Sequence, residues 1–238
     1  GVYFSVECAA YRAQYAPMAV RTSPLPPEGV REASLRVAME IISAEGPESL
    51  SLREVARRLG VSHQAPYKYF PSREHLIAEL VGRSFVAFGE ALEAAAATEL
   101  EPGPSLIAMG QGYLDFVAQH PFEYRMMFSM PLPPAETHPE MAQRAISAFQ
   151  RLREGVLRLH RHHGRPDPES LADQDALHIW ATMHGLATIL RHDSIEVIGL
   201  KDSVLQNAPM HAFISLAAAL LPPGQTPSAA AMEIAGRR

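Results

Sequence analysis

Histidine is the residue type in this 238-residue chain that most invites a chemical role, because there are eleven of them. His160, His162 and His163 lie close enough together to suggest a metal site. Metal sites, however, need ligands that converge from fixed elements, usually with carboxylate or cysteine help. These three lie at the basic end of an expected helix, where cations favour the helix dipole. The one cysteine, Cys8, also excludes a cysteine-based zinc site. We therefore predict no metal and no other cofactor.

Motifs that would support catalysis are missing from the sequence. It has no G-x-x-x-x-G-K-[ST] phosphate loop, no G-x-S-x-G nucleophile elbow, no H-E-x-x-H and no dinucleotide fingerprint. We can therefore name no candidate catalytic residue, and we predict that the chain is not an enzyme. A helical enzyme without a recognisable motif is kept as the less favoured alternative.

Composition sets the broad class. The hydrophobic content of 47% in a chain of this length allows one or two domains with a real core. The apolar runs are all shorter than the roughly 18 residues that a membrane-spanning helix needs, and the single cysteine fits a reducing compartment. We predict a cytoplasmic protein.

Residues 1–24 are expected to be a flexible tail, with 1–17 derived from a vector or from translation of upstream sequence and Met18 the natural start. Residues 223–238 are expected to be disordered.

Charge is distributed unevenly along the chain, whose net charge is −5. Residues 21–84 hold nine Lys/Arg against eight Asp/Glu, whereas residues 85–238 hold eleven against seventeen. A mildly basic segment joined to an acidic remainder would steer only the first part toward a polyanion.

Apolar residues recur every three to four positions, which predicts an all-α fold of about nine helices. We expect an N-terminal three-helix domain at 25–84, beginning with a helix from about Glu28 to Ala44, and a larger helical domain at 85–222. The helices of the second domain are expected at about 105–119, 121–129, 137–162, 168–192 and 207–221. Pro209 is expected in the first turn of the last helix, with Asn207 as its cap.

A helix-turn-helix is expected in the first domain. Ser51-x-x-Glu54 has the form of a capping box, in which each side chain satisfies the other residue's free backbone N–H. The short helix that it starts ends before Gly60, where the chain must turn in a left-handed conformation. Ser62 is then expected to cap a second short helix ending at Phe70, and Ser72 to cap a long one. Two short helices joined by a glycine turn form this motif.

The stretch Tyr67-Lys-Tyr-Phe-Pro-Ser-Arg-Glu-His-Leu76 closely resembles the signature by which TetR-type transcriptional regulators run their recognition helix into helix 4. The resemblance covers about residues 30–80, with the capping box and glycine turn in register. It implies that Gln64 could pair with adenine, His63 with guanine or a phosphate, and Ala65 with a thymine methyl group. The implied DNA-contacting residues are Ser62, His63, Gln64 and Ala65 in the major groove, and Ser51, Arg53, Tyr67, Lys68, Tyr69 and Arg73 at phosphates. Without the resemblance, the tyrosines would be interpreted as packing residues and Lys68 and Arg73 as solvated.

Pro66 falls in the middle of this stretch, where a helix should already have begun. It is the fourth residue after Ser62, so its missing N–H forfeits at most the first intrahelical bond, to the Ser62 carbonyl. The family pattern implies an apolar side chain here, facing Val55 and Leu59. We predict that the proline ring is an apolar anchor and that Phe70 is a core residue.

The segment around Trp180-x-x-x-His184-Gly185 resembles the motif of the WHG subgroup of TetR-type regulators. Small residues permit close helix approach, so we predict that helices 168–192 and 207–221 form a homodimer interface. The interface candidates are Ala181, Gly185, Thr188, Phe213 and Leu216. The alternative is that Gly185 packs inside one subunit.

Aromatic and methionine residues of the second domain could form a pocket for a mostly apolar molecule. The candidates are Phe88, Tyr113, Phe116, Phe122, Met126, Met127, Phe149, Trp180, Met183 and His184. A stripe of this kind can equally be ordinary core, and His184 is expected to be a hydrogen-bonded interior histidine rather than a metal ligand.

The resemblance implies a ligand-responsive DNA-binding transcriptional regulator. We predict a repressor that binds a nearly palindromic operator as a homodimer, because two recognition elements must meet successive major grooves. A small, mostly apolar effector would release it. A DNA-binding protein without an effector is the alternative.

Overall fold

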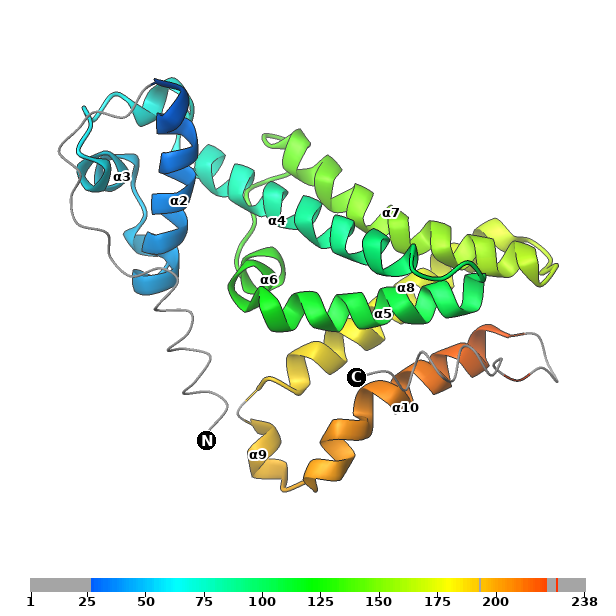
Figure 1. The fold of residues 1–238 in the computed structure, drawn as a ribbon. Helices are drawn as coiled ribbons and strands as arrows, with labels where there is room; N and C mark the ends of the chain where they lie inside the picture. Colours follow the sequence, from blue (N-terminus) through cyan, green and yellow to red (C-terminus); the bar gives the residue numbers. More distant parts are fainter. Residues whose placement is uncertain (1–26, 193, 222–225, 227–238) are drawn as a thin grey trace. The chain divides into compact units, whose positions relative to one another are not determined.

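The computed structural model describes residues 27–192, 194–221 and 226. The expected N-terminal tail, with Met18, and the C-terminal tail apart from Thr226 lie outside the described residues. Within them the fold is all-α, as predicted: nine α-helices, two 3₁₀ turns and no strand. The elements are α2 (Pro27–Glu45), η1 (Pro47–Ser49), α3 (Leu52–Leu59), η2 (Pro66–Lys68), α4 (Arg73–Ala96), α5 (Pro102–Gln119), α6 (Pro121–Phe128), α7 (Pro139–His162), α8 (Pro168–Ile189), α9 (Ser194–Ile198) and α10 (Asp202–Leu220) (Figure 1).

The chain forms two compact units. Of the described residues, the first unit contains those up to Val81 together with Pro131–His138, and the second contains Gly82–Met130 and those from Pro139 onward. The division falls inside α4, close to the expected boundary at residue 84. No sequence feature predicted that residues 131–138 belong with the first unit.

The core of the first unit comes from the apolar face of α2 and from the elements that follow. Leu35, Ala38 and Ile42 of α2, which are spaced three and four residues apart, are buried. In the segment 131–138, the ring of His138 lies 4.8 Å from that of His75 of α4, measured between centroids. The His138 ring is buried, and its Nδ1 is 2.8 Å from Oγ1 of Thr137.

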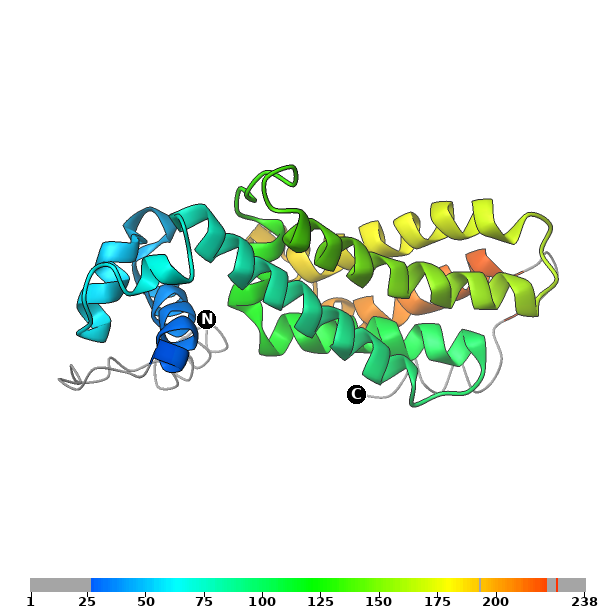
Figure 2. The ribbon, with the colours of Figure 1, turned by 90° about the horizontal axis from the view of Figure 1, so that it is seen from above.

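The second unit is built on α5, which packs against α7, α8 and α10, while α7 also packs along α8 (Figures 1 and 2). Glycines permit the closest approaches. A Cβ at Gly112 of α5 would lie 2.6 Å from the Cβ of Ala95 in α4, and one at Gly155 of α7 would lie 3.0 Å from Cδ2 of Leu106. Helix pairs that approach this closely bury their apolar faces against each other.

The C-terminal helices differ from the prediction. Helix α8 ends at Ile189, a short α9 follows, and α10 begins at Asp202, so that Pro209 lies inside α10 instead of in its first turn. Asn207 is not the cap; its Nδ2 donates to the carbonyl of Ser203 at 2.7 Å. Proline removes one helix hydrogen bond, but α10 continues because its buried face, with Phe213, Leu216 and Leu220, is held by packing.

Candidate nucleic-acid interface and ligand cavity

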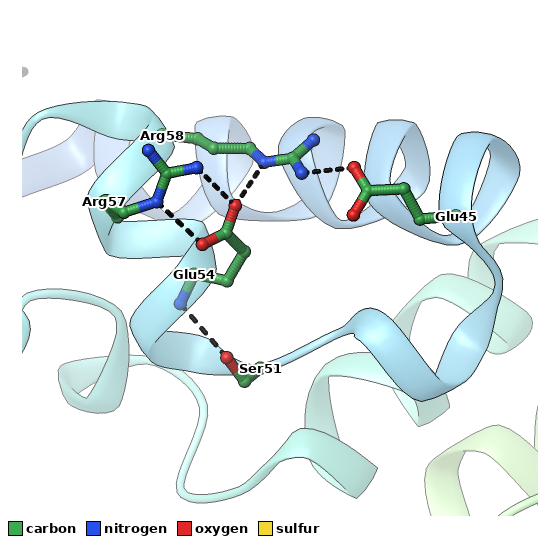
Figure 3. A network of polar contacts seen from close by, with 5 residues as sticks. All are labelled: Glu45, Ser51, Glu54, Arg57 and Arg58. Carbon is green, nitrogen blue, oxygen red and sulfur yellow. Dashed lines mark hydrogen bonds and ion pairs between the residues drawn. The ribbon is translucent and has the colours of Figure 1, made fainter.

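Helix α3 is fixed at its start by Ser51, whose hydroxyl accepts from the N–H of Glu54 at 3.1 Å, as predicted. The second predicted bond of the capping box, from the N–H of Ser51 to the Glu54 carboxylate, is replaced by bonds from two arginines. Both Glu54 oxygens accept from Arg57, at 2.7 and 2.8 Å, and one also accepts from Arg58 at 2.7 Å, while Arg58 reaches Glu45 at the end of α2 (Figure 3). The hydrogen bonds from Arg57 and then Arg58 lower the pKa of Glu54 to about 2. The network ties α3 to the end of α2.

The turn after α3 has the predicted geometry. Gly60 has φ 66° and ψ 27°, the left-handed region that favours glycine. The N–H of Val61 then donates to the carbonyl of Ala56 at 3.1 Å, which closes the helix end.

The element after the turn is not the α-helix that we predicted. Residues 63–65 form a turn, and Pro66–Lys68 form the 3₁₀ turn η2. The physical reason is Pro66. It has no N–H to offer the Ser62 carbonyl, which accepts from the N–H of Ala65 at 2.9 Å instead, in a three-residue step. The Ser62 hydroxyl accepts from the N–H of Gln64 at 3.3 Å.

Pro66 is an anchor, as the sequence predicted. Its ring is fully buried, and η2 packs against α3 and α2. The following Phe70 is also buried, at 3% exposure. These two residues hold the segment from inside and leave the residues around Pro66 to face solvent.

Seven of the ten predicted DNA-contacting residues are exposed: Ser51, Arg53, Ser62, His63, Gln64, Tyr67 and Lys68. Ala65 and Tyr69 are half-buried. Nε2 of Gln64 lies 3.1 Å from Nε2 of His63, so the two polar ends lie together at the surface. This group can offer donors and acceptors to base edges, with a cation and a phenol beside them.

Arg73, the tenth residue, has an internal role that sequence reasoning missed. Its Nε donates to the carbonyl of Leu50 at 3.1 Å, and its Nη2 donates to that of Pro47 at 2.6 Å. These carbonyls precede Ser51, so Arg73 fixes the approach to α3. The partners lie 23 and 26 residues away, and no local signal reveals such bonds.

The second unit contains a cavity of about 420 Å³ between α5, α8, α10 and the end of α7. Of the ten predicted pocket residues, Met183 lines it and the other nine do not. Its apolar walls come from residues such as Ile107, Leu159, Ile179, Phe213 and Leu220. The sequence signal that could have found it is the α10 spacing Phe213, Leu216, Ala217, Leu220, which puts all four on one face.

Most of the other pocket candidates form a packed aromatic cluster. The Phe88 ring makes edge contacts with Tyr113 and Phe116, and the Tyr124 hydroxyl is 2.6 Å from both the Tyr113 hydroxyl and Nδ1 of His184. Burial raises the pKa of both tyrosines and lowers that of His184. His184 is thus hydrogen-bonded, as predicted, but half-buried. Phe122, Met126 and Met127 are buried, and Phe149 packs on Trp180 with ring centroids 5.6 Å apart.

Comparison with known protein families gives two matches that together cover more than half of the chain. Residues 35–80 match the model described as "Bacterial regulatory proteins, tetR family", and residues 106–208 match "Tetracyclin repressor-like, C-terminal domain". The chain belongs to the TetR family of transcriptional regulators. The first match contains the helix-turn-helix, and the second contains Trp180, His184 and Gly185. Membership of the WHG subgroup stays a prediction.

Solved structures of other proteins share this fold. A protein of unknown function from Rhodococcus sp. RHA1 superposes with a TM-score of 0.68 at 24% identity, covering 81% of this chain and 96% of its own. A candidate regulatory protein, SCO4313, gives 0.63 at 25% identity, covering 84% and 100%. A tetR-family regulatory protein from Rhodococcus RHA1 gives 0.59 at 17% identity, covering 82% and 98%. A search of curated proteins found no match.

Membership of the TetR family decides against the alternative of a helical enzyme. The chain is a DNA-binding transcription factor.

The structure separates the predicted interface residues into two groups. Ala181 and Thr188 are exposed on α8, and a Cβ at Gly185 would meet nothing within 4 Å, so Gly185 does not pack inside the subunit. Phe213 and Leu216 are buried at 3% and 8% exposure and line the cavity. Their inward direction removes them from an intersubunit surface.

The histidine cluster is divided by burial. His160 is fully buried, and its Nε2 is 2.8 Å from Asp175 of α8, whereas His162 is exposed. In the described part of the chain, no three His, Cys, Asp or Glu side chains come together as a metal site would require. Among the same residues no helix has the length and apolar character to cross a bilayer.

Proposed function

We propose that this TetR-family regulator is a homodimeric repressor that acts in the cytoplasm, binds a nearly palindromic operator and is released by a small, mostly apolar effector. The observation that carries the DNA-reading part is the exposed group Ser62, His63 and Gln64 beside Tyr67 and Lys68. These side chains flank the buried Pro66, so they present hydrogen-bonding groups from a fixed backbone.

Each exposed side chain has a proposed role. Gln64 pairs with adenine through its amide, His63 bonds a guanine or a phosphate, and the methyl of Ala65 meets a thymine methyl. Tyr67, Lys68 and Tyr69 contact phosphates next to this element. Ser51 and Arg53 do so at the N-terminus of α3, where the helix dipole favours an anion. Because Arg73 is bound to backbone carbonyls, its role is to position this surface.

Dimerisation follows from the geometry of the target. Two reading surfaces must enter successive major grooves roughly 34 Å apart on one DNA face, which a symmetric dimer achieves. The supporting surface is the exposed side of α8. Leu177 and Ile189 are 56% and 55% exposed there, near Ala181, Gly185 and Thr188. Apolar and small residues on one helix face suit close packing with a second copy.

Effector control requires two states of the dimer with different affinities for DNA. An effector shifts their balance only as far as its own affinities for them differ. The cavity in the second unit supports a binding role, and α4 continues without a break from residues of the first unit into the second. A DNA-binding protein without an effector is the alternative, and an operator affinity that no cavity ligand changes would favour it.

Operator binding can be measured by fluorescence anisotropy with palindromic duplexes from the region upstream of the protein's own gene. We expect specific binding that weakens steeply with salt, because phosphate contacts release counterions. A scrambled duplex of equal length is the control. Equal affinity for both duplexes, or no salt dependence, would contradict the proposal. Repression is tested by placing the bound duplex upstream of a reporter gene, which the protein should silence.

Dimerisation can be tested with a pair of charge variants. Gly185→Arg should shift sedimentation from dimer to monomer, since it places a cation on the proposed interface. Gln150→Arg, at an exposed position of α7, is the matched control and should stay dimeric. A monomeric unmodified protein, or a dimeric Gly185→Arg variant, would exclude this α8 surface.

A further inference from the structure

The cavity in the second unit has a size and wall chemistry typical of a small-molecule site. Its volume of about 420 Å³ lies within the range of roughly 300–1,000 Å³ seen for such sites. One wall is a single face of α10, with Phe213, Leu216, Ala217 and Leu220 spaced by three and four residues. The facing walls come from α5 and α8.

Polar groups gather at one end of this cavity. Glu101 is the residue before α5, His162 is the last residue of α7, and His163 follows it directly. Burial, and then electrostatic effects of His162, His160 and Arg165, lower the pKa of His163. This shift favours the neutral imidazole, which can both donate and accept a hydrogen bond.

The charge at this end is unusual for an anion site. No lysine or arginine is among the cavity-lining residues, so a ligand carboxylate would meet the like charge of Glu101 without a cation in the lining to balance it. A ligand ammonium group would lose water against the apolar walls, with one exposed carboxylate to offset the loss. A hydroxyl avoids both penalties, because it can donate to Glu101 and accept from His163.

We propose that this cavity binds an uncharged, largely apolar molecule whose hydroxyl group lies between Glu101 and the histidines at the end of α7. This inference rests on the proposed effector response, because it identifies the chemical class of the effector. It places the site on α5, α8 and α10 and away from the aromatic cluster around Tyr124.

The expected preference for an uncharged ligand can be tested by calorimetric titration of the full chain at pH 7.5, without DNA. The three probes share the same naphthalene ring system and differ in their polar group. These are 2-naphthol, 2-naphthoate and 2-naphthylmethylammonium. We expect 2-naphthol to bind at least about tenfold more tightly than either charged probe. Tighter binding of a charged probe, or binding of none of the three, would overturn the proposal.

Two variants locate the binding site. Ala217→Leu fills the cavity and should weaken 2-naphthol binding at least about tenfold, whereas Ala218→Leu, exposed on the same helix, should leave it unchanged. Glu101→Gln leaves the apolar walls intact and should improve 2-naphthoate binding several-fold while changing 2-naphthol binding little. Because Glu101 is exposed, this variant tests the charge argument even if Ala217→Leu fails to fold. No change in naphthoate binding would overturn the assignment.

The proposed function and this inference fail in different ways. Operator binding without 2-naphthol binding would contradict the inferred ligand of the cavity but not the proposed operator binding. Binding of 2-naphthol without operator binding would contradict the proposed operator binding but not the inferred ligand.

Discussion

Nη2 of Arg73 donates a 2.6 Å hydrogen bond to the carbonyl of Pro47, across 26 residues of sequence. A second bond runs from its Nε to Leu50. A guanidinium can satisfy two carbonyls at once because its donors lie in a fixed plane. The residue that the family pattern places at a phosphate thus also holds the start of α3, so DNA affinity and stability of the first unit depend on the same side chain.

Arg73→Ala should lower the free energy of unfolding by about 2 kcal/mol, because it strands two carbonyls that had charged donors. It should also weaken operator binding. Lys68→Ala is the contrast: thermal unfolding should stay unchanged while the salt slope of binding falls by about 1. Anisotropy titrations over a salt series and thermal melts separate the two. Equal stability losses in both variants would contradict the positioning role of Arg73.

The pH dependence of stability should include a contribution from Glu54. Its folded pKa of about 2 lies below its ordinary value, so its stabilising effect is present above about pH 5 and is lost as pH falls toward 2. Glu54→Gln should therefore be less stable at pH 7, by about 1 kcal/mol, and should converge with the unmodified protein near pH 2. Urea unfolding at several pH values measures the difference. Glu48→Gln, at an exposed position, should show no such convergence.

Gln64→Ala should change which operator is bound. The variant loses the amide that distinguishes adenine, so discrimination at one base pair should fall by about 1–3 kcal/mol. Binding to a library of single-base operator variants tests this. A uniform loss across all sequences would show that Gln64 contacts the backbone instead.

Pro66→Leu should keep the fold and change operator affinity little, because leucine preserves the buried apolar contact and adds an N–H that the Ser62 carbonyl can accept. Pro66→Asp should destabilise the first unit, since it buries a charge without a partner. Circular dichroism melts compare the two. A leucine variant as unstable as the aspartate variant would show that the proline geometry itself is required.

Tyr124→Phe should destabilise the second unit by about 2 kcal/mol, because both the Tyr113 hydroxyl and Nδ1 of His184 lose their 2.6 Å partner in a buried site. Tyr67→Phe, on an exposed tyrosine, should leave stability unchanged and serves as the control. Binding of 2-naphthol should survive in the Tyr124→Phe variant if the cavity is separate from the aromatic cluster.

Local rules were enough to predict most of the fold. The 3.6-residue period placed the buried face of α2, Ser51 marked the start of α3, and Gly60 marked its end, because each feature depends on residues within one helical turn. Where a local rule met a tertiary contact, the prediction failed. Pro209 marks a helix start by propensity, yet α10 starts seven residues earlier because its buried face holds the helix together.

The sequence by itself determined the all-α class, the helix-turn-helix and the residues that face solvent around Pro66, since a buried proline and phenylalanine leave their polar neighbours outside. Tertiary structure alone decided that Arg73 binds carbonyls of a distant turn, and that the cavity is lined by α10 and not by the predicted aromatic residues. These outcomes depend on which helices approach one another closely, and spacing along the chain does not encode that distance.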